Sequence, residues 1–170
     1  LLDWLPWSHT FGGNQNFNLV LFNGGTLYID DGRPTPNETA NTVRNLREVS
    51  PTLYFNVPKG YEMLLPHLRA DAALRKSLFA RLQVLFYAGA ALPEHLWVQL
   101  HELAEQEADG QVPLLTGMGA TETAPAVLFT TPACARPGAV GVPSPGIEVK
   151  LVPFDGRYEV RVRGPNVTPG

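Results

Sequence analysis

The chain has 170 residues, 44% of them hydrophobic, which is enough for one globular domain with a core of its own. Its net charge is −3 and its Lys and Arg residues are scattered, which argues against the dense basic surface of a nucleic-acid or anionic-membrane binder. A single cysteine, Cys134, excludes an intrachain disulfide, and no run of ~20 apolar residues or signal peptide is present, so we expect a cytoplasmic protein.

Strand-like and helix-like patterns alternate along the first part of the chain. Residues 1–5 predict a buried strand, residues 10–22 a helix, and residues 26–29 a second strand. The run Thr35-Pro36-Asn37-Glu38 is a capping-box signature, so we expect a helix to follow it. Its inward face is predicted to be Ala40, Val43, Leu46 and Val49.

The same alternation continues as far as residue 115. Strands are predicted at residues 52–57, 83–87 and 112–115. Between them we expect one long helix or two short ones over residues 59–82, around Asp71, and a helix that opens at Pro93 and ends at Asp109-Gly110. The apolar stripe of this last helix is Leu96, Trp97, Leu100, Leu103 and Ala104.

This order of elements predicts an α/β fold, with a doubly wound, mostly parallel sheet and helices on both faces. After Pro132 the composition shifts to Pro, Gly and alternating Val, and strands are expected at residues 148–152 and 158–162 around the turn Asp155-Gly156. We therefore divide the chain into an α/β portion, residues 1–132, and the start of a small antiparallel β-barrel, residues 133–170.

The run from Thr116 to Thr123 carries the strongest chemical signal. Small residues, including Gly117 and Gly119, are followed by the hydroxyl of Thr121 and the carboxylate of Glu122. A hydroxyl can donate to a phosphate oxygen, a carboxylate can hold a hard cation, and glycine permits close approach of a ligand to the backbone. The alternative is an ordinary N-capped connection between a strand and a helix.

Three further segments follow predicted strands: Ser8-His9, Pro58-Lys59-Gly60 and Gly89-Ala90-Ala91. Ligands of doubly wound sheets bind beyond the carboxyl ends of the strands. These segments and the run from Thr116 to Thr123, which we call the Thr-Glu run, should therefore meet at one edge of the sheet. Lys59 is interpreted as a solvated turn residue, and His67, His95 and His101 as surface or boundary residues on helices.

Five segments occur in the order found in adenylate-forming acyl-CoA synthetases, which the chain resembles. They are Leu5-Pro6-Trp7-Ser8-His9-Thr10-Phe11-Gly12, Tyr87-Ala88-Gly89-Ala90-Ala91-Leu92-Pro93, residues 117–123, Gly138-Ala139-Val140-Gly141-Val142-Pro143 with Pro145-Gly146, and Val162-Arg163-Gly164-Pro165. Within that superfamily the runs at residues 27–32, 54–60 and 121–125 look most like those of feruloyl-CoA synthetases. The resemblance covers the whole chain.

The resemblance implies an acid–thiol ligase that uses ATP and Mg²⁺ to adenylate an aromatic carboxylic acid and then transfers the acyl group to coenzyme A. It implies catalytic roles for His9, Thr121 and Glu122, with Glu122 as the metal ligand. The implied nucleotide-binding residues are Gly89, Ala90, Ala91, Gly117, Met118, Gly119 and Thr121. The implied residues for the acid are His9, Phe11, Gln15, Gly89 and Gly119. Met118 replaces the aromatic residue that is common there, so adenine would rest on a thioether.

The resemblance also implies that the chain is part of a larger N-terminal domain, without the phosphate loop or the small C-terminal domain with its catalytic lysine. On that basis the isolated polypeptide is expected to be inactive, and exposed sheet edges are expected to favour dimerisation. Two alternatives stay open: a domain that loads aryl acids onto a carrier protein, and a non-catalytic binding domain. The residues do not choose among ferulate, coumarate, caffeate and benzoate.

Overall fold

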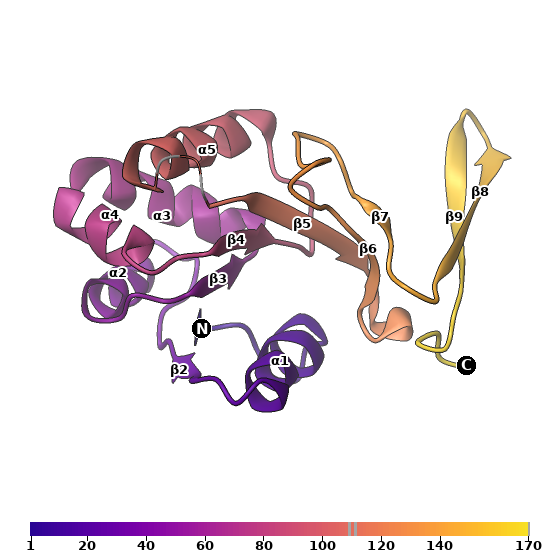
Figure 1. Cartoon of the computed structure of the whole chain (residues 1–170), viewed down its shortest axis with the longest axis horizontal. Coiled ribbons are helices and arrows are strands. Elements are labelled where there is room, and N and C mark those ends of the chain that lie inside the picture. Colours follow the sequence, from indigo (N-terminus) through magenta and orange to yellow (C-terminus); the bar gives the residue numbers. More distant parts are fainter. Residues whose placement is uncertain (109, 111, 170) are drawn as a thin grey trace.

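The computed structural model describes residues 1–108, 110 and 112–169 (Figure 1). Its helical elements are the π-helix η1 (Phe11–Phe17), α1 (Asn18–Phe22), α2 (Thr39–Glu48), α3 (Pro58–Ala70), α4 (Ala72–Phe79), α5 (Glu94–Ala108) and the 3₁₀ turn η2 (Thr121–Thr123). Its strands are β1 (Leu2–Asp3), β2 (Tyr28–Ile29), β3 (Leu53–Asn56), β4 (Val84–Tyr87), β5 (Leu114–Gly119), β6 (Ala126–Phe129), β7 (Val142–Pro143), β8 (Glu148–Phe154) and β9 (Arg157–Arg163).

The predicted α/β architecture is confirmed. The central sheet has the strand order β3-β4-β5-β6-β7, in which β3, β4 and β5 are parallel, β6 pairs antiparallel with β5, and β7 pairs antiparallel with β6 (Figure 1). Strands β1 and β2 form a separate parallel pair beside it. Within the described residues, no helix is both long and apolar enough to cross a membrane.

The sheet is covered on both faces because neighbouring strand residues point in opposite directions. Tyr54 and Leu85 belong to one buried cluster together with apolar side chains of α2, α3, α4 and α5. Phe55 and Phe86, one residue further along each strand, belong to a second cluster with Leu5, Phe11 and Val20. Figure 1 shows η1 and α1 on the side of the sheet opposite to the four longer helices. The second cluster therefore ties the segment that carries His9 to the sheet.

The predicted helices are present, with differences in the face of α2 and in the type of the first helix. The break at Asp71 is confirmed, since its carboxylate accepts hydrogen bonds from the backbone N–H groups of Ala73 and Leu74 at the start of α4. The prediction of the inward face of α2 is partly wrong. Ala40 is exposed, whereas Thr42 is buried and its hydroxyl donates a hydrogen bond to the Asp30 carboxylate at 2.6 Å. The predicted helix over residues 10–22 begins as the π-helix η1. The expected helix end at Asp109 lies outside the described residues.

The largest correction concerns the end of β5. The sequence predicts a strand that stops at Leu115, whereas β5 continues to Gly119, because the unpredicted strand β6 pairs with it antiparallel, with Gly117 opposite Phe129. The register shifts between Met118 and Gly119, which marks a bulge. The small residues of the Thr-Glu run thus belong to a strand rather than to a turn.

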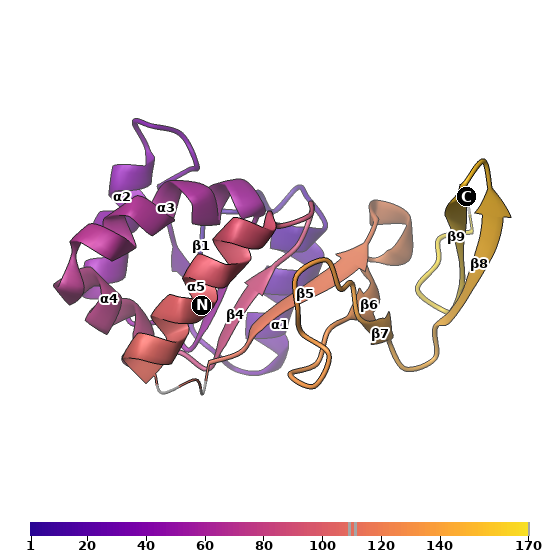
Figure 2. The same ribbon diagram turned by 90° about the horizontal axis from the view of Figure 1, so that it is seen from above.

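The small antiparallel sheet expected at the end of the chain is present as the hairpin of β8 and β9. Asp155 and Gly156 both have positive φ, 45° and 69°, as a two-residue hairpin turn requires. The hairpin stands away from the α/β body in both views (Figures 1 and 2). Its closure into a barrel and the boundary at residue 132 stay predictions.

Candidate functional site

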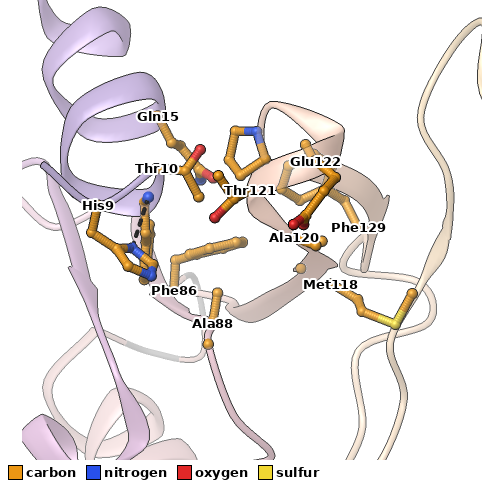
Figure 3. A pocket seen from close by; sticks show the side chains of 16 residues that line it. His9, Thr10, Gln15, Phe86, Ala88, Met118, Ala120, Thr121, Glu122 and Phe129 are labelled. Atoms are coloured by element: carbon orange, nitrogen blue, oxygen red, sulfur yellow. Dashed lines mark hydrogen bonds between the residues drawn. The ribbon is translucent and has the colours of Figure 1, made fainter. Parts of the chain in front are cut away.

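A pocket of about 320 Å³ lies where β4, β5 and η2 meet the segment before η1 (Figure 3). Nine of the residues singled out from the sequence line it: His9, Phe11, Gln15, Gly89, Gly117, Met118, Gly119, Thr121 and Glu122. Figure 3 shows His9 on one side of the pocket and Thr121 and Glu122 on the other. The structure therefore brings together residues that lie more than a hundred positions apart in the sequence.

A second pocket, of about 270 Å³, shares the small residues Gly89, Gly117 and Gly119 and Met118 with the first. Ala90 and Ala91, which do not line the first pocket, line this one. Phe86 of β4 borders the first pocket and Tyr87 the second, and adjacent strand residues face opposite ways. The two pockets therefore lie on opposite faces of the sheet end and are separated by the backbone of β5.

The η2 turn presents two of its three polar side chains, Thr121 and Glu122, to the first pocket. Its own geometry is maintained by Thr123, whose buried hydroxyl accepts a hydrogen bond from the Ala120 N–H at 2.9 Å and lies 2.8 Å from the Pro125 carbonyl oxygen. Thr121 and Glu122 are exposed and line the pocket, so both side chains are accessible to a ligand.

The backbone sets the tautomer of His9. Nδ1 of His9 accepts a hydrogen bond from the backbone N–H of Phe11 at 3.1 Å, drawn as a dashed line in Figure 3. A backbone N–H can only donate, so in the neutral imidazole the proton resides on Nε2. His9 can therefore offer an N–H donor to a ligand, a detail that the sequence does not reveal.

A buried polar pair holds η1 beside the end of β1. The Asp3 carboxylate accepts hydrogen bonds from the Leu5 N–H at 3.1 Å and from the Asn16 side-chain amide at 3.0 Å. Asp3 and Asn16 are both buried, and this burial raises the pKa of the Asp3 carboxyl above its ordinary value. Because Phe11 and Gln15 belong to the same helix as Asn16, the pair also orients two side chains of the pocket.

Aromatic side chains that sequence reasoning missed form the floor and wall of the first pocket. The ring of Phe86 lies 6.1 Å from that of Phe11 and 5.9 Å from that of Phe129, measured between centroids. Phe86 could have been found from strand alternation, because it lies on the predicted strand 83–87, directly before the segment Gly89-Ala90-Ala91. Phe129 could not, because it reaches the pocket only through the pairing of β6 with β5.

Other sequence candidates lie elsewhere. Lys59 is in the first turn of α3, is exposed, and forms an ion pair with Glu62 at 2.8 Å. With Trp4 and His9 it borders a separate apolar pocket of about 440 Å³. His67 is exposed on α3, and His95 and His101 are exposed on α5. None of these three histidines lines the first pocket.

The first pocket suits a metal ion that is coordinated mainly by a bound phosphorylated molecule rather than by protein side chains. Among the described residues, no group of three or more His, Cys, Asp or Glu side chains could hold a metal ion by itself. Glu122 is the acidic residue in the pocket wall. Mg²⁺ is usually bound through one or two carboxylates together with substrate phosphates and water, so a single carboxylate fits Mg²⁺ chelated by a phosphorylated ligand.

Comparison with known proteins gives one consistent result. The family model described as AMP-binding enzyme matches residues 1–170. Anthranilate–CoA ligase of Pseudomonas aeruginosa is 31% identical over 168 residues, which cover 94% of this chain and 29% of the ligase. Feruloyl-CoA synthase of an Amycolatopsis species is 31% identical over 160 residues, which cover 89% of this chain and 30% of the synthase. The chain thus spans less than a third of either relative.

Solved structures agree with these sequence matches. An anthranilate–CoA ligase in complex with anthranoyl-AMP superposes with a TM-score of 0.69 at 26% identity, over 94% of this chain and 30% of that one. A malonyl-CoA ligase with methylmalonyl-CoA and AMP bound superposes with a TM-score of 0.72 at 32% identity, over 98% of this chain and 35% of that one.

Proposed function

Because the chain belongs to the AMP-binding enzyme family, we propose that the protein is an ATP-dependent ligase that joins an aromatic carboxylic acid to coenzyme A. The acid, of the hydroxycinnamic type such as ferulate, first reacts with ATP to give an acyl-adenylate and pyrophosphate, and the thiol of coenzyme A then displaces AMP. The observation that carries this proposal is the meeting of His9, Gly89 and the Thr-Glu run around one pocket.

The pocket walls support an aromatic acid. Phe11, Phe86 and Phe129 present ring faces and edges against which a planar ligand can pack. The volume of about 320 Å³ is at the lower end of the roughly 300–1,000 Å³ typical of small-molecule sites. A single aromatic ring with a short side chain fits this space better than a long acyl chain.

The two pockets allow the acid and the nucleotide to bind at separate places, the acid in the first pocket and adenine in the second. The second pocket is lined by Gly89, Ala90 and Ala91, which carry at most a methyl group and so leave room for adenine beside Met118. The α-phosphate would then lie at the end of β5, close to the carboxylate of an acid in the first pocket. Gly117 and Gly119 add no side chain that would separate the reacting groups.

The reaction places negative charge on oxygens that the chain can stabilise. During attack by the carboxylate, charge accumulates on the α-phosphate, to which the Thr121 hydroxyl can donate a hydrogen bond. Nε2–H of His9 can donate to the acid's carboxylate and hold it in line for attack. Glu122 would hold Mg²⁺, which supplies charge neutralisation on the phosphates when bound.

The proposal is tested with the protein produced from its complete gene. Pyrophosphate release is measured with ATP, Mg²⁺ and each of ferulate, coumarate, caffeate and benzoate, with and without EDTA. Thioester formation is then compared between coenzyme A and a phosphopantetheinyl carrier protein. We expect release that requires an aromatic acid and Mg²⁺, followed by transfer to coenzyme A. Transfer to the carrier alone would favour the loading domain, and a protein that binds no nucleotide would contradict the proposal.

The role of His9 gives a more local prediction. Replacing His9 with alanine should raise the KM for the acid and lower the rate of adenylation, together by about 10- to 100-fold, because a hydrogen bond to a charged group is lost. Steady-state kinetics with the preferred acid measure both parameters. His95→Ala, at an exposed position of α5, is the matched control and should behave as wild type. Unchanged kinetics for His9→Ala would show that His9 does not bind the carboxylate of the acid.

A further inference from the structure

The chain that follows β9 returns to the η2 turn. We call residues 164–168 the return segment. Asn166 donates from its side-chain amide nitrogen to the Thr123 carbonyl oxygen at 2.6 Å and to the Ala126 carbonyl oxygen at 2.8 Å. The backbone N–H of Thr168 donates to the Glu122 carbonyl oxygen at 2.8 Å. Figure 1 shows the end of the chain beside this turn.

These bonds add donors for three backbone carbonyls in and directly after the turn. Local donors serve some of them: Ala120 accepts from the Thr123 N–H, Thr121 from the Ala124 N–H, and Pro125 from the Ala120 N–H. The carbonyls of Glu122, Thr123 and Ala126 receive theirs from the return segment. A buried carbonyl that loses its donor costs free energy, so the return segment stabilises this conformation of the turn.

The chemistry of Asn166 suits this position closely. An amide NH₂ has two hydrogens, and here each is directed to a different carbonyl oxygen. An aspartate of the same shape would set one carboxylate oxygen, in place of this nitrogen, against both carbonyl oxygens, which is repulsive. The Asn166 side-chain oxygen is buried and is not hydrogen-bonded to any described residue, so the contacts on the nitrogen side are the ones that hold the side chain.

We propose that Asn166 is a positioning residue, which fixes the turn from Thr121 to Thr123 so that the Thr121 hydroxyl and the Glu122 carboxylate face the pocket. Asn166 lies outside both the first and the second pocket and acts only through the backbone that follows those two residues, at Thr123 and Ala126. The inference rests on the proposed function, because Glu122 is taken as the group that holds Mg²⁺ with the nucleotide.

The test compares Asn166→Ala and Asn166→Asp in the protein from its complete gene. Asn37→Asp, at an exposed position before α2, is the matched control. The readouts are the acid-dependent rate of pyrophosphate release, the Mg²⁺ concentration for half-maximal rate, and Tm. We expect both Asn166 variants to fold, to react about 10- to 100-fold more slowly, and to need more Mg²⁺, since small displacements of reacting groups have effects of this size. Asn166→Asp should be the slower of the two.

A double-mutant cycle separates positioning from a general structural role. In a Glu122→Gln background, Asn166→Ala should reduce the rate less than it does in the wild type, because one of the two groups it positions has already lost its charge. Variants with a lowered Tm but an unchanged rate and Mg²⁺ requirement, an additive cycle, or failure of both variants to fold would each overturn the proposal.

Failure of the proposed function gives a different pattern. In that case the wild-type protein releases no pyrophosphate with any acid, and the Asn166 variants are compared by titration of ATP with Mg²⁺. Weaker Mg²⁺-dependent binding in both variants would still support the positioning role, and binding equal to that of the wild type would overturn it.

Discussion

Replacing Glu122 with glutamine should lower the rate of adenylation by about 10²–10³-fold and leave the fold intact. Glutamine has the same shape as glutamate but no negative charge, so it cannot hold Mg²⁺ beside the phosphates with comparable strength. Glu122 is exposed at the pocket wall, so the change removes no buried contact. The loss should therefore appear in the rate of pyrophosphate release and in the Mg²⁺ requirement, while Tm stays unchanged.

Two control variants make this prediction specific. Glu122→Asp keeps the charge one methylene further back and should recover part of the rate, above all at high Mg²⁺. Glu102→Gln removes an exposed carboxylate of α5, outside both pockets at the sheet end, and should match the wild type. A Glu122→Gln enzyme with full activity at low Mg²⁺ would show that the cation is held elsewhere.

Replacing Gly119 with alanine should disrupt both stability and activity, because the end of β5 leaves no room for a side chain. An added Cβ would overlap with the carbonyl oxygen of Pro125, which accepts a hydrogen bond from the Ala120 N–H. The strands would have to separate at the bulge, which typically costs about 1–3 kcal/mol. That movement displaces the η2 turn, so adenylation should fall by about 100-fold. Thermal denaturation and pyrophosphate release measure the two effects.

Gly25→Ala is the matched control for this substitution. An added Cβ at Gly25 would have its nearest neighbour, Val20 Cγ1, at 3.5 Å, which is ordinary van der Waals contact. Its Tm and activity should stay close to those of the wild type. A Gly119→Ala protein with wild-type Tm and rate would mean that the β5–β6 end yields easily and does not govern the geometry of the turn.

Much of the α/β portion could be predicted from the sequence because its signals are local. Alternation of short apolar runs with helical periodicity placed β3, β4 and α5, and the side chain of Asp71 marked the break between α3 and α4. The hairpin turn at residues 155–156 needs residues that accept positive φ, and Asp-Gly supplies them. The resemblance to acyl-CoA synthetases, feruloyl-CoA synthetases among them, is likewise confirmed.

Features that depend on tertiary pairing were missed. Gly117 and Gly119 have no side chains to continue an alternating pattern, so the extension of β5 to Gly119 depends on its pairing with β6, which the sequence did not predict. The predicted inward face of α2 included Ala40, which is exposed, and omitted the polar residue Thr42, which is buried with its hydroxyl bonded to Asp30. The binary pattern alone could not distinguish the π-helical turns of η1 from an ordinary helix.

The sequence predicted the residues of the site more completely than the strands and turns around them. Carboxyl ends of parallel strands meet at one edge, so sequence order alone indicated that His9, Gly89 and Thr121 would converge, and the structure places them around one pocket. Phe129 and Asn166 were not predicted. Phe129 reaches the site through an unexpected strand, and Asn166 through hydrogen bonds to residues 40 or more positions earlier in the chain.

The shared wall between the two pockets has an evolutionary consequence. Gly117, Met118 and Gly119 border both cavities, so a substitution there that reshapes the space for one ligand alters the space for the other. New acid preferences are therefore more accessible through residues that border the first cavity alone, such as Gln15 and Phe129, than through β5 between residues 117 and 119. Divergence within such enzymes should accumulate at those outer positions, while the strand core between the cavities changes slowly.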